Sequence, residues 1–262
     1  MNNVNKTMYI PLYGKAYVSK KGILLQDPKA EEIWVAEEFP LGGKSKSKYL
    51  AYYMAMRSAV MDGWLRDKMQ ENPQAVVLHL GCGMDSRVER VGFQGHMWYD
   101  VDFPQVIEER KKYYQESDCY HMIASDVQET KWLQQTPEHE TAIVVMEGIS
   151  MYLVPEALAA VLKSVSKHFS QVSLLMDCYT TFAAKASKYK NPVKEVGVSQ
   201  VYGLDDPKDL EQGTAMQYVK AHPMTPDHMI DQLTGMEKAL FHKLYAGSMS
   251  QKLYRMYEYI SK

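Results

Sequence analysis

The sequence predicts a doubly wound α/β fold in which helices cover a mostly parallel, seven-stranded, Rossmann-like sheet. Two observations predict this fold. Short apolar runs rich in β-branched residues recur at intervals of roughly 20 to 30 residues, with helical stretches between them, as in parallel strands joined by right-handed crossovers. Glycine or carboxylate residues directly follow these runs, at the strand ends where open α/β sheets bind ligands.

Five strands are predicted by runs that are short enough to be buried strands, at residues 75–80, 98–103, 120–124, 141–146 and 171–176. Helices are predicted at 30–39 and 45–69, and two more begin at Pro104 and Pro155, because proline suits the first helical turn. Residues 239–245 and 252–260 are expected to be the last two strands. The short turn between them predicts an antiparallel hairpin at the C-terminal edge of the sheet.

The composition excludes several classes of protein. The 262 residues are 46% hydrophobic and carry a formal net charge of −2, so no basic field predicts binding to nucleic acid. No apolar run reaches the roughly 18 residues of a membrane span. Cys82, Cys119 and Cys178 form no C-x-x-C pair, so neither disulfides nor a metal site is expected. Reduced cysteines and a polar N-terminus favour a cytoplasmic protein.

A glycine-rich turn follows the first predicted strand. Gly81 and Gly83 allow the backbone to turn tightly and to approach a ligand closely. The segment is neither a P-loop nor a full dinucleotide fingerprint, because Ser86 stands where the third glycine belongs. Asp85 would oppose a pyrophosphate there. Asp102 follows Gly81 by about 20 residues, the spacing of an acid that accepts both hydroxyls of a ribose.

Carboxylates come at or just after four of the five predicted parallel strands: Asp102, Asp126, Glu147 and Asp177. Such a ring repels an anionic nucleotide and favours a cationic or hydroxyl-rich ligand. S-adenosylmethionine has an adenosine, a sulfonium, an amino acid tail and no phosphate. The sequence therefore predicts S-adenosylmethionine as the cofactor.

Each chemical group of this cofactor can be paired with residues at the ends of the predicted strands. The turn is expected to lie against its tail and ribose through Gly81, Cys82 and Gly83. Asp102 is expected to accept from the ribose hydroxyls. Asp126 and the backbone of Val127 are expected to meet the adenine. Each carboxylate could instead serve as a helix cap or turn residue.

Arg57 falls within the apolar stripe of the helix at 45–69. A guanidinium on an apolar face needs a partner, and the sequence leaves two open: a structural ion pair, or an anionic group of a ligand. In the second case Arg57 would bind the tail carboxylate of the cofactor through two parallel hydrogen bonds. Glu147 would face its cationic amino group.

Four motifs carry a family resemblance: V-V-L-H-L-G-C-G-M-D-S-R-V-E-R, Y-D-V-D-F-P-Q-V-I-E-E-R-K, S-D-V and M-E-G-I-S-M-Y-L. Together they resemble the leucine carboxyl methyltransferase family, which includes the tetracenomycin-type polyketide O-methyltransferases. The resemblance implies a class I methyltransferase fold. It also implies cofactor contacts at Arg57, Gly81, Asp102, Asp126, Val127 and Glu147. Lys15 resembles, by its position in the sequence, a lysine that lies near the cofactor in this family. His79 departs from the family pattern, and the sequence after residue 181 matches no part of it.

The expected activity is O-methylation of a hydroxyl or carboxyl oxygen of a small molecule. Tyr152, just past the fourth strand, is expected to orient the acceptor, whereas His222 and His228 receive no role. Three alternatives stay open: carboxyl methylation of a protein C-terminus, a nicotinamide-dependent oxidoreductase, and a non-catalytic S-adenosylmethionine-binding module. The acceptor, the use of a general base and the oligomeric state are not determined by the sequence.

This reading divides the chain into four parts. Residues 1–70 are expected to form a helical segment that covers the cofactor site, and residues 71–180 the α/β core. Residues 181–236, rich in proline, are expected to be a helical and loop insert that caps the acceptor. Residues 237–262 would complete the sheet.

Overall fold

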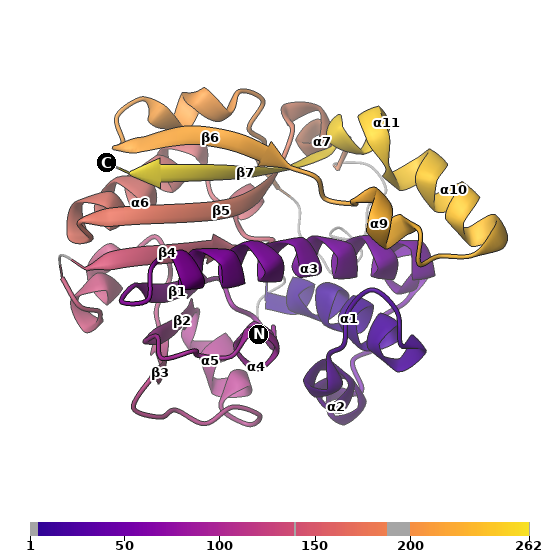
Figure 1. Cartoon of the computed structure of the whole chain (residues 1–262), viewed down its shortest axis with the longest axis horizontal. Helices are drawn as coiled ribbons and strands as arrows, with labels where there is room; N and C mark the ends of the chain where they lie inside the picture. Colours follow the sequence, from indigo (N-terminus) through magenta and orange to yellow (C-terminus); the bar gives the residue numbers. More distant parts are fainter. Residues whose placement is uncertain (1–4, 139, 188–199, 262) are drawn as a thin grey trace.

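Seven strands form one sheet in the computed structural model, which describes residues 5–138, 140–187 and 200–261 (Figure 1). The strand order is β3-β2-β1-β4-β5-β7-β6. The strands are β1 (Val76–Leu80), β2 (Trp98–Asp102), β3 (Tyr120–Ala124), β4 (Thr141–Met146), β5 (Gln171–Tyr179), β6 (Met216–His222) and β7 (Tyr254–Ser261). The first five are parallel, and β7 runs antiparallel to both β5 and β6. The prediction of a mostly parallel seven-stranded sheet with an antiparallel edge is confirmed.

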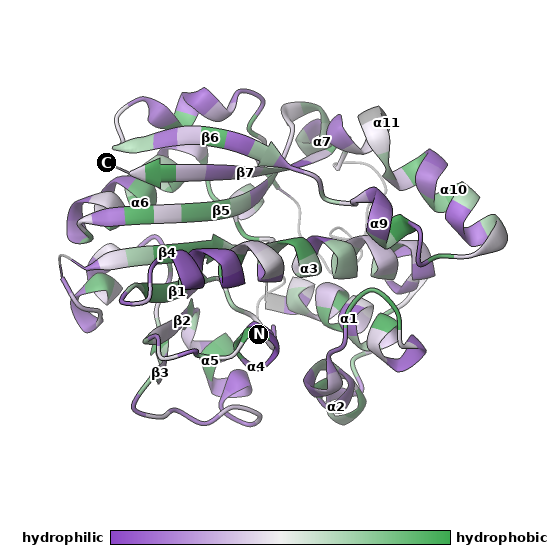
Figure 2. Cartoon of the chain, viewed as in Figure 1, coloured by the Kyte–Doolittle hydropathy of each residue, from purple (hydrophilic) through white to green (hydrophobic). Residues whose placement is uncertain are grey.

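The prediction of an antiparallel hairpin from residues 239–245 and 252–260 at the edge of the sheet is wrong. Residues 239–245, expected to be a strand, lie in a helix, and β6 comes from the part expected to be an insert of helices and loops. The strands β6 and β7 are therefore not a hairpin, since three helices separate them along the chain. Figure 2 shows why β6 gives a weak signal: hydrophilic segments interrupt it, whereas β4 in the middle of the sheet is mostly hydrophobic.

Within the described residues there are ten α-helices: α1 (Tyr9–Lys21), α2 (Pro28–Glu37), α3 (Lys48–Glu71), α4 (Arg87–Val91), α5 (Pro104–Arg110), α6 (Pro155–His168), α7 (Thr181–Ala186), α9 (Asp227–Ile230), α10 (Gly235–Tyr245) and α11 (Gly247–Gln251). Four of them confirm predicted helices to within a few residues at most boundaries: α2, α3, α5 and α6. No helical pattern in the sequence predicts α1, because nine of its 13 residues are buried and it has no polar face.

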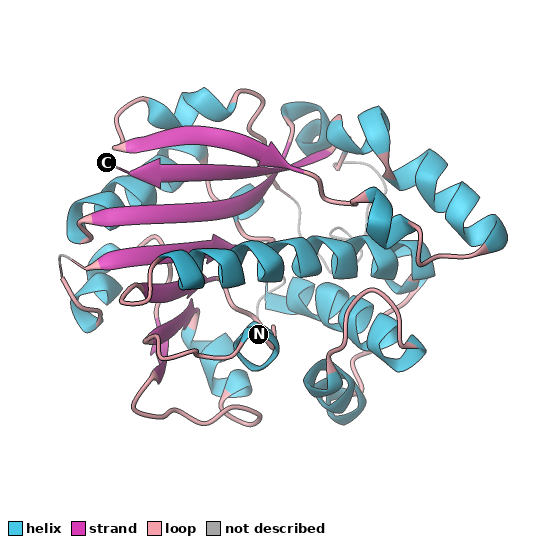
Figure 3. Cartoon of the chain, viewed as in Figure 1, coloured by secondary structure: helices cyan, strands magenta, loops and turns pink. Residues whose placement is uncertain are grey.

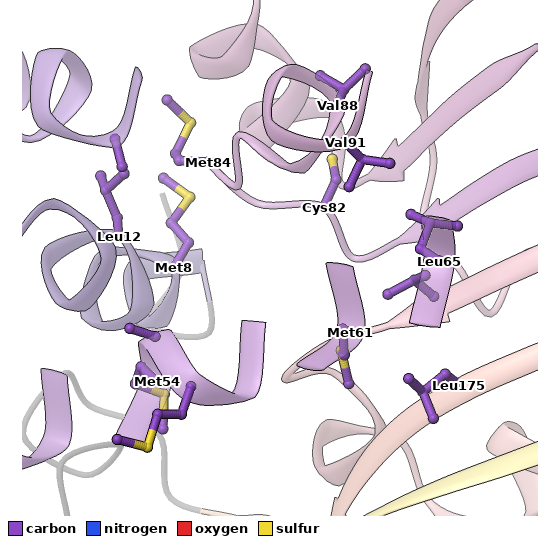
Figure 4. Packing of buried hydrophobic residues seen from close by; sticks show 14 of the residues in the cluster. Met8, Leu12, Met54, Met61, Leu65, Cys82, Met84, Val88, Val91 and Leu175 are labelled. Atoms are coloured by element: carbon purple, nitrogen blue, oxygen red, sulfur yellow. The ribbon is translucent and has the colours of Figure 1, made fainter. Parts of the chain in front are cut away.

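Alternate strand residues pack on opposite faces of the sheet, as the period of two requires. On one face Val77 and Leu175 meet Met61 and Leu65 of α3. Figure 4 shows this layer, with Met8 and Leu12 extending it toward Met84. On the other face the strands pack against α6, and these residues form a second core cluster. The parallel strands are therefore buried on both sides.

Most of the remaining helices gather at one end of the sheet. Figures 1 and 3 show α1, α7, α10 and α11 beyond the end at which β4 and β5 finish. This is the end where an open α/β sheet binds ligands. Among the helices of the described chain, none has both the length and the apolar character that crossing a membrane requires.

Candidate active site

One cavity of about 560 Å³ lies at the carboxyl ends of the parallel strands. All nine residues predicted for the site line it: Arg57, Gly81, Cys82, Gly83, Asp102, Asp126, Val127, Glu147 and Tyr152. The structure thus brings together residues from α3, from the ends of β1, β2, β3 and β4, and from the turn after β4.

The glycine turn after β1 forms a cradle that side chains would fill. Gly81 has φ +70° and Gly83 has φ +50°, a left-handed conformation that favours glycine. A Cβ atom on Gly81 would lie 2.4 Å from Cγ2 of Ile149, and one on Gly83 would lie 3.1 Å from Cβ of Met8. The backbone of the turn is therefore exposed to the cavity in a way that only glycine permits.

Asp102 closes this turn from the neighbouring strand. Its Oδ2 accepts the backbone N–H of Gly83 at 2.8 Å, and its Oδ1 accepts the N–H of Phe103 at 2.7 Å. Burial raises the pKa of Asp102 to about 6, although both hydrogen bonds oppose the rise. The two hydrogen bonds fix the orientation of the carboxylate, but they only partly stabilise its negative charge. The carboxylate is therefore suited to accept further hydrogen bonds from hydroxyl groups of a ligand.

Asp126 and Val127 follow β3 at the cavity wall. Asp126 Oδ1 accepts the backbone N–H of Gln128 at 2.9 Å, so the alternative role as a turn residue is realised. The side chain of Asp126 remains half-exposed and lines the cavity. The carbonyl of Val127 accepts from the indole N–H of Trp132 at 3.0 Å, which fixes the backbone beside the cavity.

Arg57 is held by a set of acceptors at the cavity floor. Its Nη2 donates to Glu147 Oε1 at 2.8 Å, and its Nη1 donates to Asp177 Oδ2 and to the hydroxyl of Tyr254, both at 2.8 Å. Of the two partners left open by the sequence, the structural ion pair is present. The Nε–H group is also buried, and it has no acceptor among the described residues. Since a guanidinium has five N–H donors, Arg57 retains capacity for an anionic group in the cavity.

Glu147 joins two arginines. Besides Arg57, it accepts from Arg87 Nη2 and from the hydroxyl of Ser58. Burial alone would raise the pKa of Glu147, but the two guanidinium groups lower it well below its usual range. Glu147 is therefore an anion at neutral pH.

The ion pairs continue behind the cavity as one buried network. Four cations and five carboxylates belong to it: Lys15, Arg57, Arg87 and Arg90 with Asp27, Asp62, Asp85, Glu147 and Asp177. His79 joins this network as well, with its Nε2 3.9 Å from Asp85 Oδ2. Lys15 and Arg57 line the cavity together with Asp85 and Glu147, so groups of both charges face it.

Sequence reasoning did not find Asp62, Arg87 and Arg90. One signal was available: Asp62 lies next to Met61, inside the apolar stripe of α3, as Arg57 does. A charged residue on such a face predicts a buried partner. The partners, Arg87 and Arg90, follow the glycine turn directly.

Five tyrosines line the cavity from α3, the turn after β4, the end of β5, α10 and the start of β7. This tyrosine wall consists of Tyr53, Tyr152, Tyr179, Tyr245 and Tyr254. Four of the rings form a continuous chain, with centroid distances of 5.8 Å from Tyr245 to Tyr53, 6.3 Å from Tyr53 to Tyr254 and 4.9 Å from Tyr254 to Tyr179. Burial raises the pKa of Tyr152 to about 12, so its hydroxyl is a donor at neutral pH.

The histidines that the sequence left without a role lie elsewhere. His222 pairs with Glu258 at 2.7 Å, between the two antiparallel strands, and His228 is exposed on α9. Neither lines the cavity. His79, which departs from the family pattern, does line the cavity; it is buried, with its Nδ1 3.3 Å from Asp100 Oδ1.

The leucine carboxyl methyltransferase family matches residues 12–166, which is more than half of the chain. The tetracenomycin polyketide synthesis O-methyltransferase TcmP of Streptomyces glaucescens is 29% identical over 213 residues, covering 80% of this chain and 79% of that protein. The S-adenosyl-L-methionine-dependent methyltransferase dpfgK of Gibberella zeae is 26% identical over 183 residues, covering 64% and 61%.

A crystal structure of a candidate methyltransferase from Thermobifida fusca superimposes with a TM-score of 0.59 at 13% identity, covering 95% of this chain and 94% of that one. The likeness establishes a shared fold. The family match confirms the resemblance that the four sequence motifs carry.

Proposed function

Because this chain belongs to the leucine carboxyl methyltransferase family, we propose that it transfers a methyl group to an oxygen atom of a small-molecule acceptor. Its class is methyltransferase, and its cofactor is S-adenosylmethionine. The cofactor supplies a methyl group on a sulfonium. The residues of this chain must bind it, align the acceptor with it and exclude water.

The observation that carries the proposal is the fit between the cavity and this cofactor. At the glycine cradle, Cβ atoms on Gly81 and Gly83 would lie against Ile149 and Met8, two residues that line the cavity. Beside the cradle, Asp102 offers carboxylate oxygens to the ribose hydroxyls, and the buried Nε–H of Arg57 offers a donor to the tail carboxylate. We propose these roles together with Asp126 and Val127 at the adenine.

The charge of the site also favours this cofactor. Cations and carboxylates of the buried network line the cavity together, which suits a cofactor whose tail carries both an ammonium and a carboxylate. A nicotinamide dinucleotide carries a pyrophosphate instead. The buried carboxylate of Asp85 lies where that pyrophosphate would approach α4, which disfavours the oxidoreductase alternative.

The tyrosine wall indicates the kind of acceptor. Its rings are apolar surfaces with hydroxyl donors at their edges. Burial raises the pKa of Tyr53 and Tyr152 to about 12, so neither is a base at neutral pH. The carboxylates that line the cavity, Asp102 and Glu147 among them, have the roles given above. The proposed acceptor is a carboxylate or an acidic hydroxyl attached to an apolar or aromatic body, which requires no base from the tyrosine wall.

Tyr152 is proposed to orient this acceptor. The hydroxyl lies in the cavity near Thr7, and its raised pKa keeps it protonated. A donor near the attacking oxygen would fix the direction of attack. Carboxyl methylation of a protein C-terminus uses the same chemistry, so an extended peptide is the second acceptor to test. The proposed location is the cytoplasm, since all three cysteines are free thiols.

The test is calorimetric titration of the purified protein with S-adenosylhomocysteine and, separately, with NADH. Micromolar binding of S-adenosylhomocysteine is expected, with no binding of NADH. Asp102→Ala and Arg57→Ala should both weaken binding, whereas Asp118→Ala, at an exposed position, serves as the control. Binding that ignores both substitutions would contradict the proposed site.

Catalysis is tested next with methyl-labelled S-adenosylmethionine and a panel of aromatic carboxylates, aliphatic carboxylates, phenols and peptides with free C-termini. Transfer to any of them excludes a non-catalytic binding module. Labelled peptide without labelled small molecules would favour the protein C-terminus as acceptor.

A further inference from the structure

Tyr254, the first residue of β7, lines the cavity and belongs to a group of three residues that are all hydrogen-bonded to one another. The hydroxyl of Tyr254 donates to Asp177 Oδ2 at 2.6 Å and accepts from Arg57 Nη1 at 2.8 Å. Arg57 Nη1 donates to the same Asp177 oxygen at 2.8 Å. Each of the three groups therefore contacts the other two.

This triangle fixes one side of the guanidinium. Both hydrogens of Arg57 Nη1 have acceptors in it, and Nη2 is held by Glu147 on the other side. With both terminal nitrogens engaged, the guanidinium plane cannot rotate freely about its long side chain. The Nε–H, which has no acceptor in the described part of the chain, is thereby held in one direction.

Asp177 extends the same constraint to the turn after β4. Its Oδ1 accepts the backbone N–H of Gly148 at 2.7 Å. A Cβ atom on Gly148 would lie 3.5 Å from Arg57 Nη1, so the guanidinium lies close beside the turn. Asp177 thus sets the distance between Arg57 and the residue that follows Glu147.

We infer that Tyr254 and Asp177 are positioning residues that hold the Arg57 guanidinium ready for the tail carboxylate of the cofactor. The inference rests on the proposed function, because it assigns the open donor of Arg57 to that carboxylate. It adds Asp177 of β5 and Tyr254 of β7, neither of which has an assigned role. A preorganised donor loses less entropy on binding than one that must be ordered by the ligand.

The test uses two ligands that differ only at the end that Arg57 would contact. S-adenosylhomocysteine has the amino acid tail, and 5′-methylthioadenosine has the same adenosine and sulfur without it. The variant is Tyr254→Phe, which removes the hydroxyl and keeps the ring that packs against Tyr53 and Tyr179. Tyr259→Phe is the matched control, since Tyr259 is a buried tyrosine of the same strand whose hydroxyl donates to Pro207 O at 3.0 Å, outside the cavity.

Tyr254→Phe is expected to weaken S-adenosylhomocysteine about tenfold, within the range for loss of a hydrogen bond to a charged group. It should change 5′-methylthioadenosine less than about twofold, and Tyr259→Phe should change neither. Asp177→Asn should show the same preference and serves as the second variant if Tyr254→Phe folds poorly. Equal weakening of both ligands, or of neither, would overturn the inference. Failure of the unmodified protein to bind S-adenosylhomocysteine would instead overturn the proposed function.

Discussion

The carboxylate of Asp102 at the end of β2 binds the backbone N–H of Gly83 in the turn after β1, at 2.8 Å. One hydrogen bond therefore connects the glycine cradle to the acid proposed to hold the ribose. The second oxygen binds the N–H of Phe103 at 2.7 Å. Because the group is also buried, its pKa is raised to about 6, and this has measurable consequences.

The first prediction concerns stability. The usual pKa of an aspartate is 3.8 and the folded-state pKa of Asp102 is about 6, so between these values the folded state binds more protons than the unfolded state. Asp102 therefore lowers the free energy of unfolding as pH rises through this window. Relative to Asp102→Asn, the unmodified protein should lose on the order of 2–3 kcal/mol between pH 4 and pH 7. Urea unfolding of both proteins measures this, and a difference that is constant with pH would refute it.

The second prediction concerns the affinity for S-adenosylhomocysteine. Accepting two ribose hydroxyls requires the ionised carboxylate, so protonation of Asp102 competes with binding. Affinity should be constant above pH 7 and fall by up to about tenfold per unit below pH 6. Calorimetry across this range should show the fall in the unmodified protein. In Asp102→Asn the affinity should be low and independent of pH, and a fall of equal size there would assign the titration to another group.

The third prediction concerns the glycine cradle. In Gly81→Ala, the left-handed φ of +70° and the overlap with Ile149 both oppose the new methyl group. We expect a loss of about 2–4 kcal/mol in the free energy of unfolding, together with loss of S-adenosylhomocysteine binding. Gly63→Ala in α3 is the control, because nothing lies within 4 Å of its Cβ position. There alanine should be neutral or stabilise by up to about 1 kcal/mol. Similar losses in both variants would contradict the proposed cause.

The fourth prediction concerns Tyr152. If its hydroxyl orients the acceptor, Tyr152→Phe should slow turnover by about 100-fold, as for loss of a positioned donor, with little change in the affinity for S-adenosylhomocysteine. The rate is measured with the best acceptor of the labelled panel, and affinity by calorimetry. Equal loss of rate and affinity would reject the orienting role.

The sequence was informative where burial is complete and uninformative where it is partial. The five parallel strands are continuous apolar runs because both faces are covered, and each was located to within a few residues. β6 lies at the sheet edge, where Met216 is its one buried residue, so its pattern is weak. Residues 239–245 are a short, largely apolar segment whose pattern fits both the period of a helix and that of a strand. In the structure Phe241 is fully buried and residues 242–244 are exposed, a helical arrangement that the sequence did not distinguish from a strand.

The site shows a similar limit. Residues at strand ends could be predicted to meet, because parallel strands finish at one edge. Arg57 could be predicted to need a partner, but its contact with Tyr254 depends on the pairing of β7 with β5, which brings Tyr254 opposite Tyr179. No local pattern in the sequence encodes that register. The same holds for the contacts of Arg87 with Asp62 and Glu147, which join three distant parts of the chain.

The strand order determines which strands can pair first while the chain is being synthesised. β7 lies between β5 and β6, and within the described sheet it is the strand that β6 pairs with. During translation β6 leaves the ribosome before β7 and must wait for it before joining the sheet. The turn after β4 and Arg57 are likewise made long before Tyr254, which completes their hydrogen bonds. A nascent chain that lacks β7 would therefore expose the unpaired edge of β5, and such edges favour pairing with other chains.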